Sequence, residues 1–396
     1  RRIVSRCLAI DPQDRYSSVE KLIRELRCMR RFACRRRVLY RFSIAVTAAV
    51  CIAAAISIYM IRDYRYHKKS VQFANESIRE AAMQALGKKD KEIIYPYELE
   101  QVTTLILCSD RIFTSWQEHQ DFHDNEWFVF NEEDRAEEPA DLSDLKYFEN
   151  LHTLVLDNQG ISDLHMLKGL PLEKLSLQKN ELVSLSGISD CNTLSCLHLT
   201  DNPLEDVAPL AGISSLRELK LSQTAVSDIS PFQDIPLRNL DVSNTLVTDF
   251  SVLPSSNNLQ YLLVSGMGEE DIEKLGQMQQ LVQLGVFESD IESLSQLSGL
   301  KYLESLDFTN CQKVKSLDGI EEFPSLTYLG IAGTGITDIS ALKNAAMLQM
   351  LELTNAPVTD FSVLKDIPQL NTIWIDSGKE GLINQEDIPD VTIWVQ

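Results

Sequence analysis

The sequence predicts an α/β solenoid of units of about 22 residues, preceded by a short helical segment and one transmembrane helix. Three observations support this prediction. An L-x-x-L-x-L pattern, with conservative replacements such as Val242, Ile373 and Ile375, occurs eleven times between residues 151 and 375, at steps of 21 to 23 residues. A stretch of 20 residues nearer the N-terminus carries no charge. The formal net charge of the chain is −21, but its sign changes at that uncharged stretch.

Residues 1–28 are expected to form a helix, a turn and a second helix, because Asp11 can cap a short turn with Pro12 at its first position. The string C-L-x-x-D-P-x-x-R-Y-S-S, over residues 7–18, resembles the last segment of a eukaryote-like Ser/Thr protein kinase domain, as found in bacterial membrane receptors. The resemblance implies a structural role for Asp11, Pro12 and Arg15. In that family the Arg that matches Arg15 pairs with the Glu of an A-P-E motif and holds the C-lobe together.

The chain lacks the motifs with which a kinase performs catalysis. It has no Gly-rich loop, β3 Lys, H-R-D loop or D-F-G Asp, and phosphoryl transfer requires all of them. We therefore expect this chain to hold no catalytic residue and to need no cofactor. ATP and Mg²⁺ are expected only for a kinase body upstream. Because the sequence starts at Arg1 without Met, we expect a fragment of a longer chain.

A basic segment at 29–41 precedes the uncharged stretch at 42–61. Twenty helical residues rise about 30 Å, the thickness of the hydrocarbon core of a bilayer. The more basic N-terminal flank predicts a single-pass protein of the cell membrane, with its N-terminus in the cytoplasm and the repeats outside. Small residues at four-residue spacing would allow self-association through this helix; they are Ala45, Ala49, Ala53 and Ser57.

A buried helix and a signal peptide both fit the uncharged stretch less well than a membrane span does. A buried helix of a soluble domain seldom runs 20 residues without a charge, and a cleaved signal peptide starts near Met with a short basic region.

The charge is unevenly distributed along the chain. Residues 1–69 carry 17 Lys and Arg residues and 5 acidic residues, whereas the remainder carries 20 basic and 53 acidic residues. The acidic remainder argues against a nucleic-acid partner. Beside a span, the basic run favours contact with anionic lipid.

Residues 62–97 are expected to form a stalk and a helical cap, because 71–94 have helical periodicity and Gly87 gives a stop signal. Residues 98–396 form the repeat domain, with an early copy of the pattern at Val102 and a closing strand at 388–395. The main copies begin at Leu151, Leu172, Leu194, Leu216, Leu237, Leu259, Leu281, Leu303, Leu326, Leu348 and Leu370.

The second half of each unit often carries an apolar-x-Asp-apolar element, as in Val226-Ser-Asp-Ile229. Together the two halves resemble the leucine-rich repeats of internalin-like bacterial surface proteins. That resemblance implies a short strand on the concave face and a turn or 3₁₀ segment on the convex face. The position usually held by Asn keeps it only at Asn180 and Asn202, so we expect no continuous Asn ladder. The unit at Leu259 lacks the Asp element, and we expect it to be irregular.

An insertion at about 113–140 interrupts the first repeats, and we expect it to fold on the convex side or to protrude. His119 and His123 are four residues apart within it, but the H-E-x-x-H order of zinc proteases is absent. We interpret both as polar surface residues and predict no metal site. The four cysteines after residue 61 are expected to be free thiols; they are Cys108, Cys191, Cys196 and Cys311.

The variable positions beside the second Leu of each strand project from the concave face. From the sixth main unit onward many are aromatic or apolar, and Gly285 and Gly330 would leave room beside an acidic residue. We predict a binding surface there for a protein, peptide or cell-wall ligand. The alternative is that these side chains only pack on one another. The candidate residues are Tyr261, Leu263, Phe287, Asp307, Tyr328, Met350 and Trp374.

The function expected from these features is that of a ligand-binding sensor domain of a membrane Ser/Thr protein kinase. The alternative is a membrane-anchored surface or adhesion protein that does not signal. An extracellular hydrolase has no support, because the sequence shows no nucleophile with a base and no set of metal ligands.

Overall fold

The computed structural model describes residues 19–124, 141–253 and 258–396. The chain divides into two compact units, Arg1–Ser70 and Val71–Gln396, and each is described by itself. The kinase-like residues Asp11, Pro12 and Arg15 lie outside the described residues.

The first unit contains one continuous helix of 50 residues, α2 (Val19–Lys68). It passes through the predicted basic segment, the predicted span and the start of the predicted stalk without a break. Among the residues that the structure describes, no helix is long and apolar enough to cross a membrane. The prediction of a transmembrane helix at 42–61 was therefore wrong. It relied on the absence of charge over that stretch, whereas the helix that contains the stretch extends through charged sequence on both sides. The predicted single-pass anchoring and self-association depended on that span.

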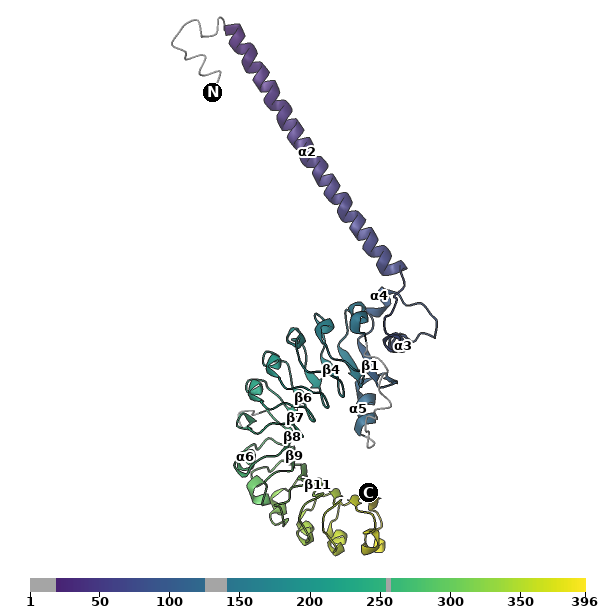
Figure 1. Cartoon of the computed structure of the whole chain (residues 1–396), viewed down its shortest axis with the longest axis vertical. Coiled ribbons are helices and arrows are strands. Elements are labelled where there is room, and N and C mark those ends of the chain that lie inside the picture. Colours follow the sequence, from purple (N-terminus) through teal and green to yellow (C-terminus); the bar gives the residue numbers. More distant parts are fainter. Residues whose placement is uncertain (1–18, 125–140, 254–257) are drawn as a thin grey trace, which may run out of the picture. The chain divides into compact units, whose positions relative to one another are not determined.

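Over the residues that the structure describes, the second unit is a solenoid with a single curved sheet of 14 strands (Figure 1). Neighbouring strands are parallel throughout, except that β2 runs antiparallel to β1 at the N-terminal edge. The strands are β1 (Thr104–Cys108), β2 (Arg111–Phe113), β3 (Thr153–Asp157), β4 (Lys174–Ser176), β5 (Cys196–His198), β6 (Glu218–Lys220), β7 (Asn239–Asp241), β8 (Tyr261–Ser265), β9 (Gln283–Phe287), β10 (Ser305–Asp307), β11 (Tyr328–Gly330), β12 (Met350–Glu352), β13 (Thr372–Ile375) and β14 (Thr392–Val395).

The register of the sheet aligns the central Leu of each repeat. Leu154 pairs with Leu175 and Leu175 with Leu197, and the row continues in the same way to Ile373 in β13. Because each of these side chains is buried against the coils on either side, the repeats share one continuous hydrophobic core. The residues on either side of this row point to the concave face and are aligned with one another as well.

Short helices line the opposite side of the coils. Most are 3₁₀ segments, and the irregular unit at Leu259 has the α-helix α6 (Glu269–Leu275) in their place. The 3₁₀ segments are η3 (Leu142–Tyr147), η4 (His165–Leu167), η5 (Ile188–Asp190), η6 (Ala208–Leu210), η7 (Ser230–Phe232), η9 (Leu294–Leu297), η10 (Ile320–Glu322), η11 (Ser340–Asn344), η12 (Ser362–Asp366), η13 (Glu380–Leu382) and η14 (Gln385–Asp387).

The repeated Asp explains where several of these segments begin. The Asp228 carboxylate accepts the Ser230 N–H at 2.8 Å, and Asp338 and Asp360 do the same for the residue two positions later. Such a bond satisfies an amide that the start of a helical turn leaves without a partner. The apolar residues on either side of the Asp enter the core, as Val226 and Ile229 do.

The position usually held by Asn serves two kinds of contact. Asn180 and Asn202 bridge adjacent coils. In each, the side-chain oxygen accepts a backbone N–H of the preceding coil, and the side-chain NH₂ donates to a backbone carbonyl of that coil. Thr224 and Thr334 only donate to a carbonyl of their own coil. Cys311 bridges coils again, because its thiol donates to the Val286 carbonyl at 2.9 Å and its sulfur accepts from the Ser289 amide. The Asn ladder is therefore discontinuous, as expected.

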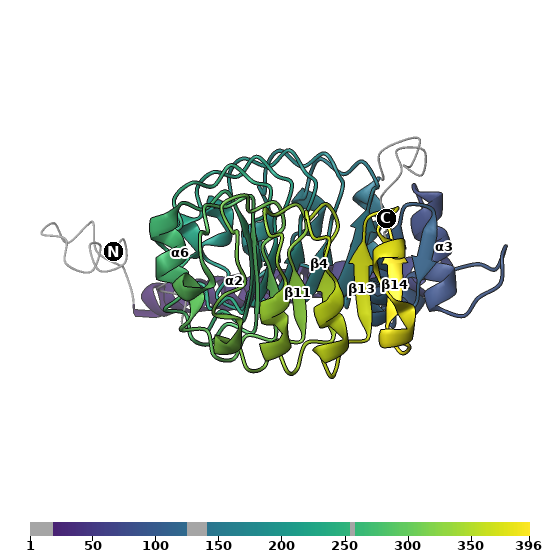
Figure 2. The same cartoon turned by 90° about the horizontal axis from the view of Figure 1, so that it is seen from below.

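Both ends of the solenoid are covered. At the N-terminal end α3 (Glu76–Ala85) buries Ile78, Ala81 and Met83 in the core, and a short α4 (Pro96–Leu99) follows. The Asp144 carboxylate accepts the backbone N–H groups of Ala74 and Asn75 and so fixes the start of α3. At the C-terminal end β14 pairs with β13, as expected for a closing strand (Figure 2).

Candidate functional site

The inserted segment brings a helix to the concave face. Helix α5 (Trp116–Asp124) follows β2 and lies on the inner side of the curved sheet (Figure 1). His119 contacts Asp157 of β3, and Trp116 contacts Lys174 of β4 and His198 of β5. The expectation that the insertion folds on the convex side or protrudes was therefore wrong for its described part. A sequence pattern carries no signal for the face on which an insertion folds, because the contacts that decide it are distant in the chain.

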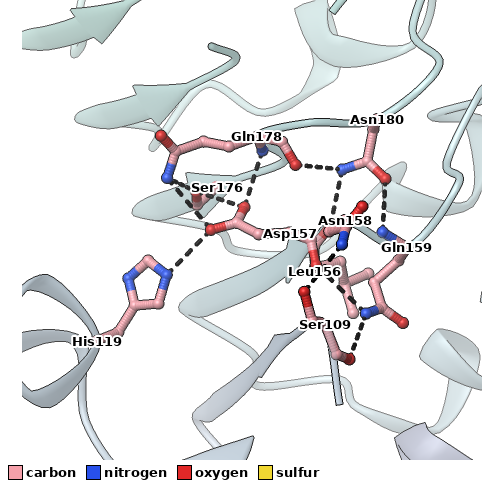
Figure 3. A network of polar contacts seen from close by, with 9 residues as sticks. All are labelled: Ser109, His119, Leu156, Asp157, Asn158, Gln159, Ser176, Gln178 and Asn180. Carbon is pink, nitrogen blue, oxygen red and sulfur yellow. Dashed lines mark hydrogen bonds and ion pairs between the residues drawn. The ribbon is translucent and has the colours of Figure 1, made fainter. Parts of the chain in front are cut away.

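His119 is buried, with 1% of its surface exposed, so its interpretation as a polar surface residue was wrong. Its Nε2 donates to Asp157 Oδ2 at 3.0 Å (Figure 3). The side chain of His123 lies outside the described residues.

Asp157 is the centre of a buried polar network (Figure 3). Its Oδ1 accepts the Ser176 hydroxyl at 2.7 Å and the Gln178 amide N–H at 2.8 Å, while Oδ2 accepts His119 and the Gln178 side chain. Asn180 extends the network to the backbone of Gln159. Burying a carboxylate is costly unless donors replace its water, and here four donors do so. The network therefore ties α5 to the coils that contain β3 and β4.

Trp116 covers the next part of the concave face. Its ring centroid lies 5.2 Å from that of His198, and the Lys174 ammonium lies 5.1 Å from the Trp116 ring centroid. A cation over an indole face is favourable. The N-terminal part of the concave face is thus occupied by a helix of the same chain.

The predicted binding surface lies further along the sheet, from β8 to β13. Tyr261 is its most exposed member, at 40%, and the other candidates are half-buried. They are Leu263, Phe287, Asp307, Tyr328, Met350 and Trp374. The register places Tyr328 beside Met350, and Trp374 in the row of Asp307.

The room expected at the two glycines is filled by neighbouring side chains. A Cβ at Gly285 would lie 2.6 Å from the Phe287 ring and 2.7 Å from a Leu263 methyl, so these two side chains already cover that glycine. At Gly330 a Cβ would lie 2.5 Å from the Asp307 carboxyl carbon. Part of the surface therefore packs on itself, as in the alternative prediction for these side chains.

Asp307 has partners of its own on this surface. Its Oδ1 accepts both the amide and the hydroxyl of Thr309, and Oδ2 accepts the Tyr328 hydroxyl at 3.3 Å. Burial and the nearby Asp307 charge raise the pKa of Tyr328 well above its ordinary value. Tyr328 is therefore a neutral hydrogen-bond donor at physiological pH.

Two groups on the N-terminal part of the concave face combine a thiol, an imidazole and a carboxylate. In each group the three donor atoms lie within 4.8 Å of one another. One consists of Cys108, His119 and Asp157, and the other of Cys196, His198 and Glu218. Among the described residues, Cys108, Cys191, Cys196 and Cys311 form no disulfide bond, as expected, and all four are buried.

The second group does not have the geometry of a nucleophile with a proton relay. His198 Nε2 faces both Glu218 Oε1, at 2.7 Å, and Cys196 Sγ, at 3.4 Å. A relay needs the nucleophile and the orienting carboxylate on different nitrogens of the imidazole, which acts as the base. Burial also raises the pKa of Cys196 far above its ordinary value, which disfavours a nucleophilic thiolate. Burial lowers the pKa of His198, and the His198 hydrogen bond lowers that of Glu218, so a neutral imidazole donates to a carboxylate.

His198 and Glu218 occupy the variable positions that are predicted to project from the concave face, but the sequence analysis did not connect either residue with Cys196. The available signal was a Cys-x-His pair within one strand and a Glu 22 residues after the Cys, a full repeat later. In a parallel solenoid such a spacing brings the residues side by side, and here Cys196 pairs with Glu218.

Comparison with solved structures supports the fold. An internalin (inlF) from Listeria monocytogenes matches with a TM-score of 0.58 at 21% sequence identity, over 82% of this chain and 91% of that chain. The functional domain of InlJ from the same species, which includes a cysteine ladder, gives a TM-score of 0.43 at 18% identity, over 77% and 81%. The plant peptide hormone receptor RGFR1, in complex with RGF2, gives 0.42 at 18%, over 60% and 46%. No protein-family model and no curated protein matches the sequence. The predicted leucine-rich-repeat solenoid is confirmed.

Proposed function

We propose that this leucine-rich-repeat domain binds a protein or peptide on its concave face, over the strands from β8 to β13. The observation that carries the proposal is the exposed ring of Tyr261 at one end of a surface that holds several half-buried aromatic and apolar side chains in adjacent rows of the sheet. Aromatic residues supply large contact areas at little cost in conformational entropy, and they dominate the binding energy of many interfaces. Concave faces are also the surfaces that solenoids use most for binding.

The charge of the region fits a partner with basic groups. Asp307 and Glu352 lie in one row of the sheet, on either side of Gly330. We therefore expect a preferred ligand that combines an apolar or aromatic side chain with a Lys or Arg. A cell-wall fragment remains a competing ligand class, and peptide and glycan probes distinguish the two.

The proposal is tested by selecting peptides against the full chain from a displayed library and measuring their dissociation constants by calorimetry. Tyr261→Ala and Trp374→Ala should each weaken binding by roughly tenfold or more. Tyr302→Ala is the matched control, because Tyr302 is 68% exposed but lies outside the strands. If the two strand variants bind as the wild type does, or if Tyr302→Ala weakens binding equally, the proposed surface is wrong.

A signalling role is a second part of the proposal, and it rests on the kinase-like segment with Asp11, Pro12 and Arg15. The domain would act as the sensor of a Ser/Thr protein kinase. The alternative is a surface or adhesion protein without signalling. Reading the genomic sequence upstream of Arg1 decides between them, because a kinase requires H-R-D and D-F-G motifs there at the family's spacing.

The location of the repeats is part of the same proposal: we place them on the cell surface, as in the bacterial proteins that the repeats resemble. Adding a protease to intact cells should cleave the repeat domain while a cytoplasmic marker stays intact. Protection of both proteins would contradict a surface location.

A further inference from the structure

The group formed by Cys196, His198 and Glu218 lies outside the proposed binding surface and has a different chemistry. Cys196 and His198 are two residues apart in β5, so their side chains leave the same face of the strand. In the register of the sheet Glu218 of β6 is the direct neighbour of Cys196. The fold therefore brings three different donor atoms together from two adjacent strands.

The three donor atoms converge on one point. His198 Nε2 lies 3.4 Å from Cys196 Sγ and 2.7 Å from Glu218 Oε1, and all three atoms are within 4.8 Å of one another. Cys196 and His198 are buried, at 6% and 2% exposed, and Glu218 is half-buried. A sulfur, an imidazole nitrogen and a carboxylate oxygen that lie this close together could each supply one ligand atom to a metal ion.

We propose that Cys196, His198 and Glu218 bind one divalent metal ion of the zinc class, which includes Zn²⁺ and Co²⁺. Thiolate, imidazole and carboxylate are the three ligand types of protein zinc sites, whereas Mg²⁺ and Ca²⁺ require oxygen ligands. Zinc bond lengths put neighbouring ligand atoms of a tetrahedral site about 3.4–3.6 Å apart. The sulfur–nitrogen distance already matches. The Glu218 oxygen must retreat by about 0.7 Å, which its flexible and half-exposed side chain permits.

Binding is balanced by the loss of one proton. In the metal-free protein the Cys196 thiol is protonated, the His198 imidazole is neutral and Glu218 is ionised. On binding, the thiol proton leaves to solvent, the imidazole proton moves from Nε2 to Nδ1, and the carboxylate remains ionised. Two negative ligands then neutralise the dication. Lys174 and Lys220, the neighbours of Cys196 and His198 in their rows, favour the thiolate.

The other group with these donor types is less suited to a metal. Both carboxylate oxygens of Asp157 accept two hydrogen bonds each, from His119, Ser176 and Gln178. A metal would have to displace donors that keep this buried carboxylate stable. Glu218, in contrast, accepts a hydrogen bond from His198 at one oxygen, and the Asn239 amide lies 3.5 Å from the other. The proposal is therefore restricted to the Cys196 group.

Co²⁺ is the probe for the test, added to the full-length reduced chain without a polyhistidine tag. The wild type should bind one equivalent, with thiolate-to-cobalt absorption in the near ultraviolet that excess Zn²⁺ abolishes. Calorimetry in buffers with different ionisation enthalpies should show release of about one proton. Because the Trp116 ring lies 5.2 Å from that of His198, bound Co²⁺ should also quench its fluorescence. Trp116→Phe should remove that quenching and keep the absorption.

Three ligand variants and two controls locate the site. Cys196→Ser should abolish the charge-transfer band, and His198→Gln and Glu218→Gln should weaken binding by more than roughly tenfold. Glu218→Gln keeps an acceptor for His198, so it remains informative if the other variants fail to fold. Cys191→Ser is the matched control, a buried thiol that belongs to neither group. The proposal fails if the wild type shows no thiolate band, if Cys196→Ser keeps it, or if Cys108→Ser removes it instead.

Discussion

His119, from a helix inserted after the first strands, donates a hydrogen bond from Nε2 to Asp157 Oδ2 at 3.0 Å, with both side chains buried. This contact joins residues 38 positions apart in the sequence. Together with the contacts of Trp116, it holds α5 over the N-terminal part of the concave face.

His119→Ala should destabilise the solenoid by about 1–3 kcal/mol, because it removes one donor from a buried carboxylate. Urea-induced unfolding followed by circular dichroism measures the change. His165→Ala is the control: its side chain is 70% exposed, and we expect a change within about 0.5 kcal/mol. Equal stability of the two variants would contradict a structural role for the His119–Asp157 pair.

Gly330→Ala should also destabilise the protein, by about 1–3 kcal/mol, because the new Cβ would lie 2.5 Å from the Asp307 carboxyl carbon. Asp307 would have to give up hydrogen bonds to Thr309 or Tyr328. Thermal unfolding measures the effect. Gly212→Ala is the matched control, since no atom lies within 4 Å of its Cβ, and it should be nearly neutral. If Gly330→Ala leaves the stability unchanged, Asp307 is free to move away from the new Cβ.

Cys311→Ala should cost more stability than Cys191→Ala, although both remove one buried sulfur. Cys311 bridges two coils through Val286 and Ser289, and its loss leaves a buried carbonyl and a buried amide without these partners. The additional cost should be about 1–3 kcal/mol, measured by chemical unfolding under reducing conditions. Equal costs would mean that the thiol only fills space. Burial raises the pKa of Cys311 to about 11, so the thiol is protonated at physiological pH and able to donate.

Acid should weaken the protein through the repeated Asp caps. Hydrogen bonds from Ser230, Ser340 and Ser362, from the backbone amide first, lower the pKa of Asp228, Asp338 and Asp360 below the ordinary 3.8. Their stabilisation is complete above the ordinary pKa and is lost as the pH falls through the lowered values.

The corresponding variant replaces all three Asp residues by Asn, which can still accept the amide hydrogen bond but does not titrate. Thermal unfolding between about pH 6 and pH 2 should show a smaller loss of stability on acidification than in the wild type. An unchanged pH profile would show that other carboxylates cause the acid sensitivity. Asp206 accepts the Ala208 amide in the same way. The single variant Asp206→Asn therefore tests whether Asn is tolerated at the capping position.

The periodic part of the structure could be predicted from the sequence, because the same contacts recur in every coil. A Leu in one repeat identifies its neighbours, as with Leu154 and Leu175, without knowledge of the rest of the fold. The Asp at the start of the convex segments was recognisable for the same reason. The closing strand and the position of the helical cap followed from local patterns, and the cap helix ends two residues before Gly87.

What could not be predicted depends on contacts that do not repeat. Nothing near His119 in the sequence indicates that Asp157 is its partner, so a buried residue was assigned to the surface. Gly285 suggested space, whereas the side chains of Phe287 and Leu263 fold over it. The uncharged stretch at 42–61 was predicted to form an apolar helix of its own. In the structure it is part of the longer helix α2, and the described part of the chain contains no helix that is long and apolar enough to cross a membrane.

The position of α5 also limits the size of what can be bound. With the first coils taken up by Trp116 and His119, the proposed surface from β8 to β13 covers five steps between strands, or about 24 Å. An extended chain advances about 3.3 Å per residue, so a peptide laid across these strands would engage about seven residues. Shortening a bound peptide below that length should reduce its affinity residue by residue. Lengthening it past β7 and β6 should add nothing, because α5 covers the coils of β3 to β5.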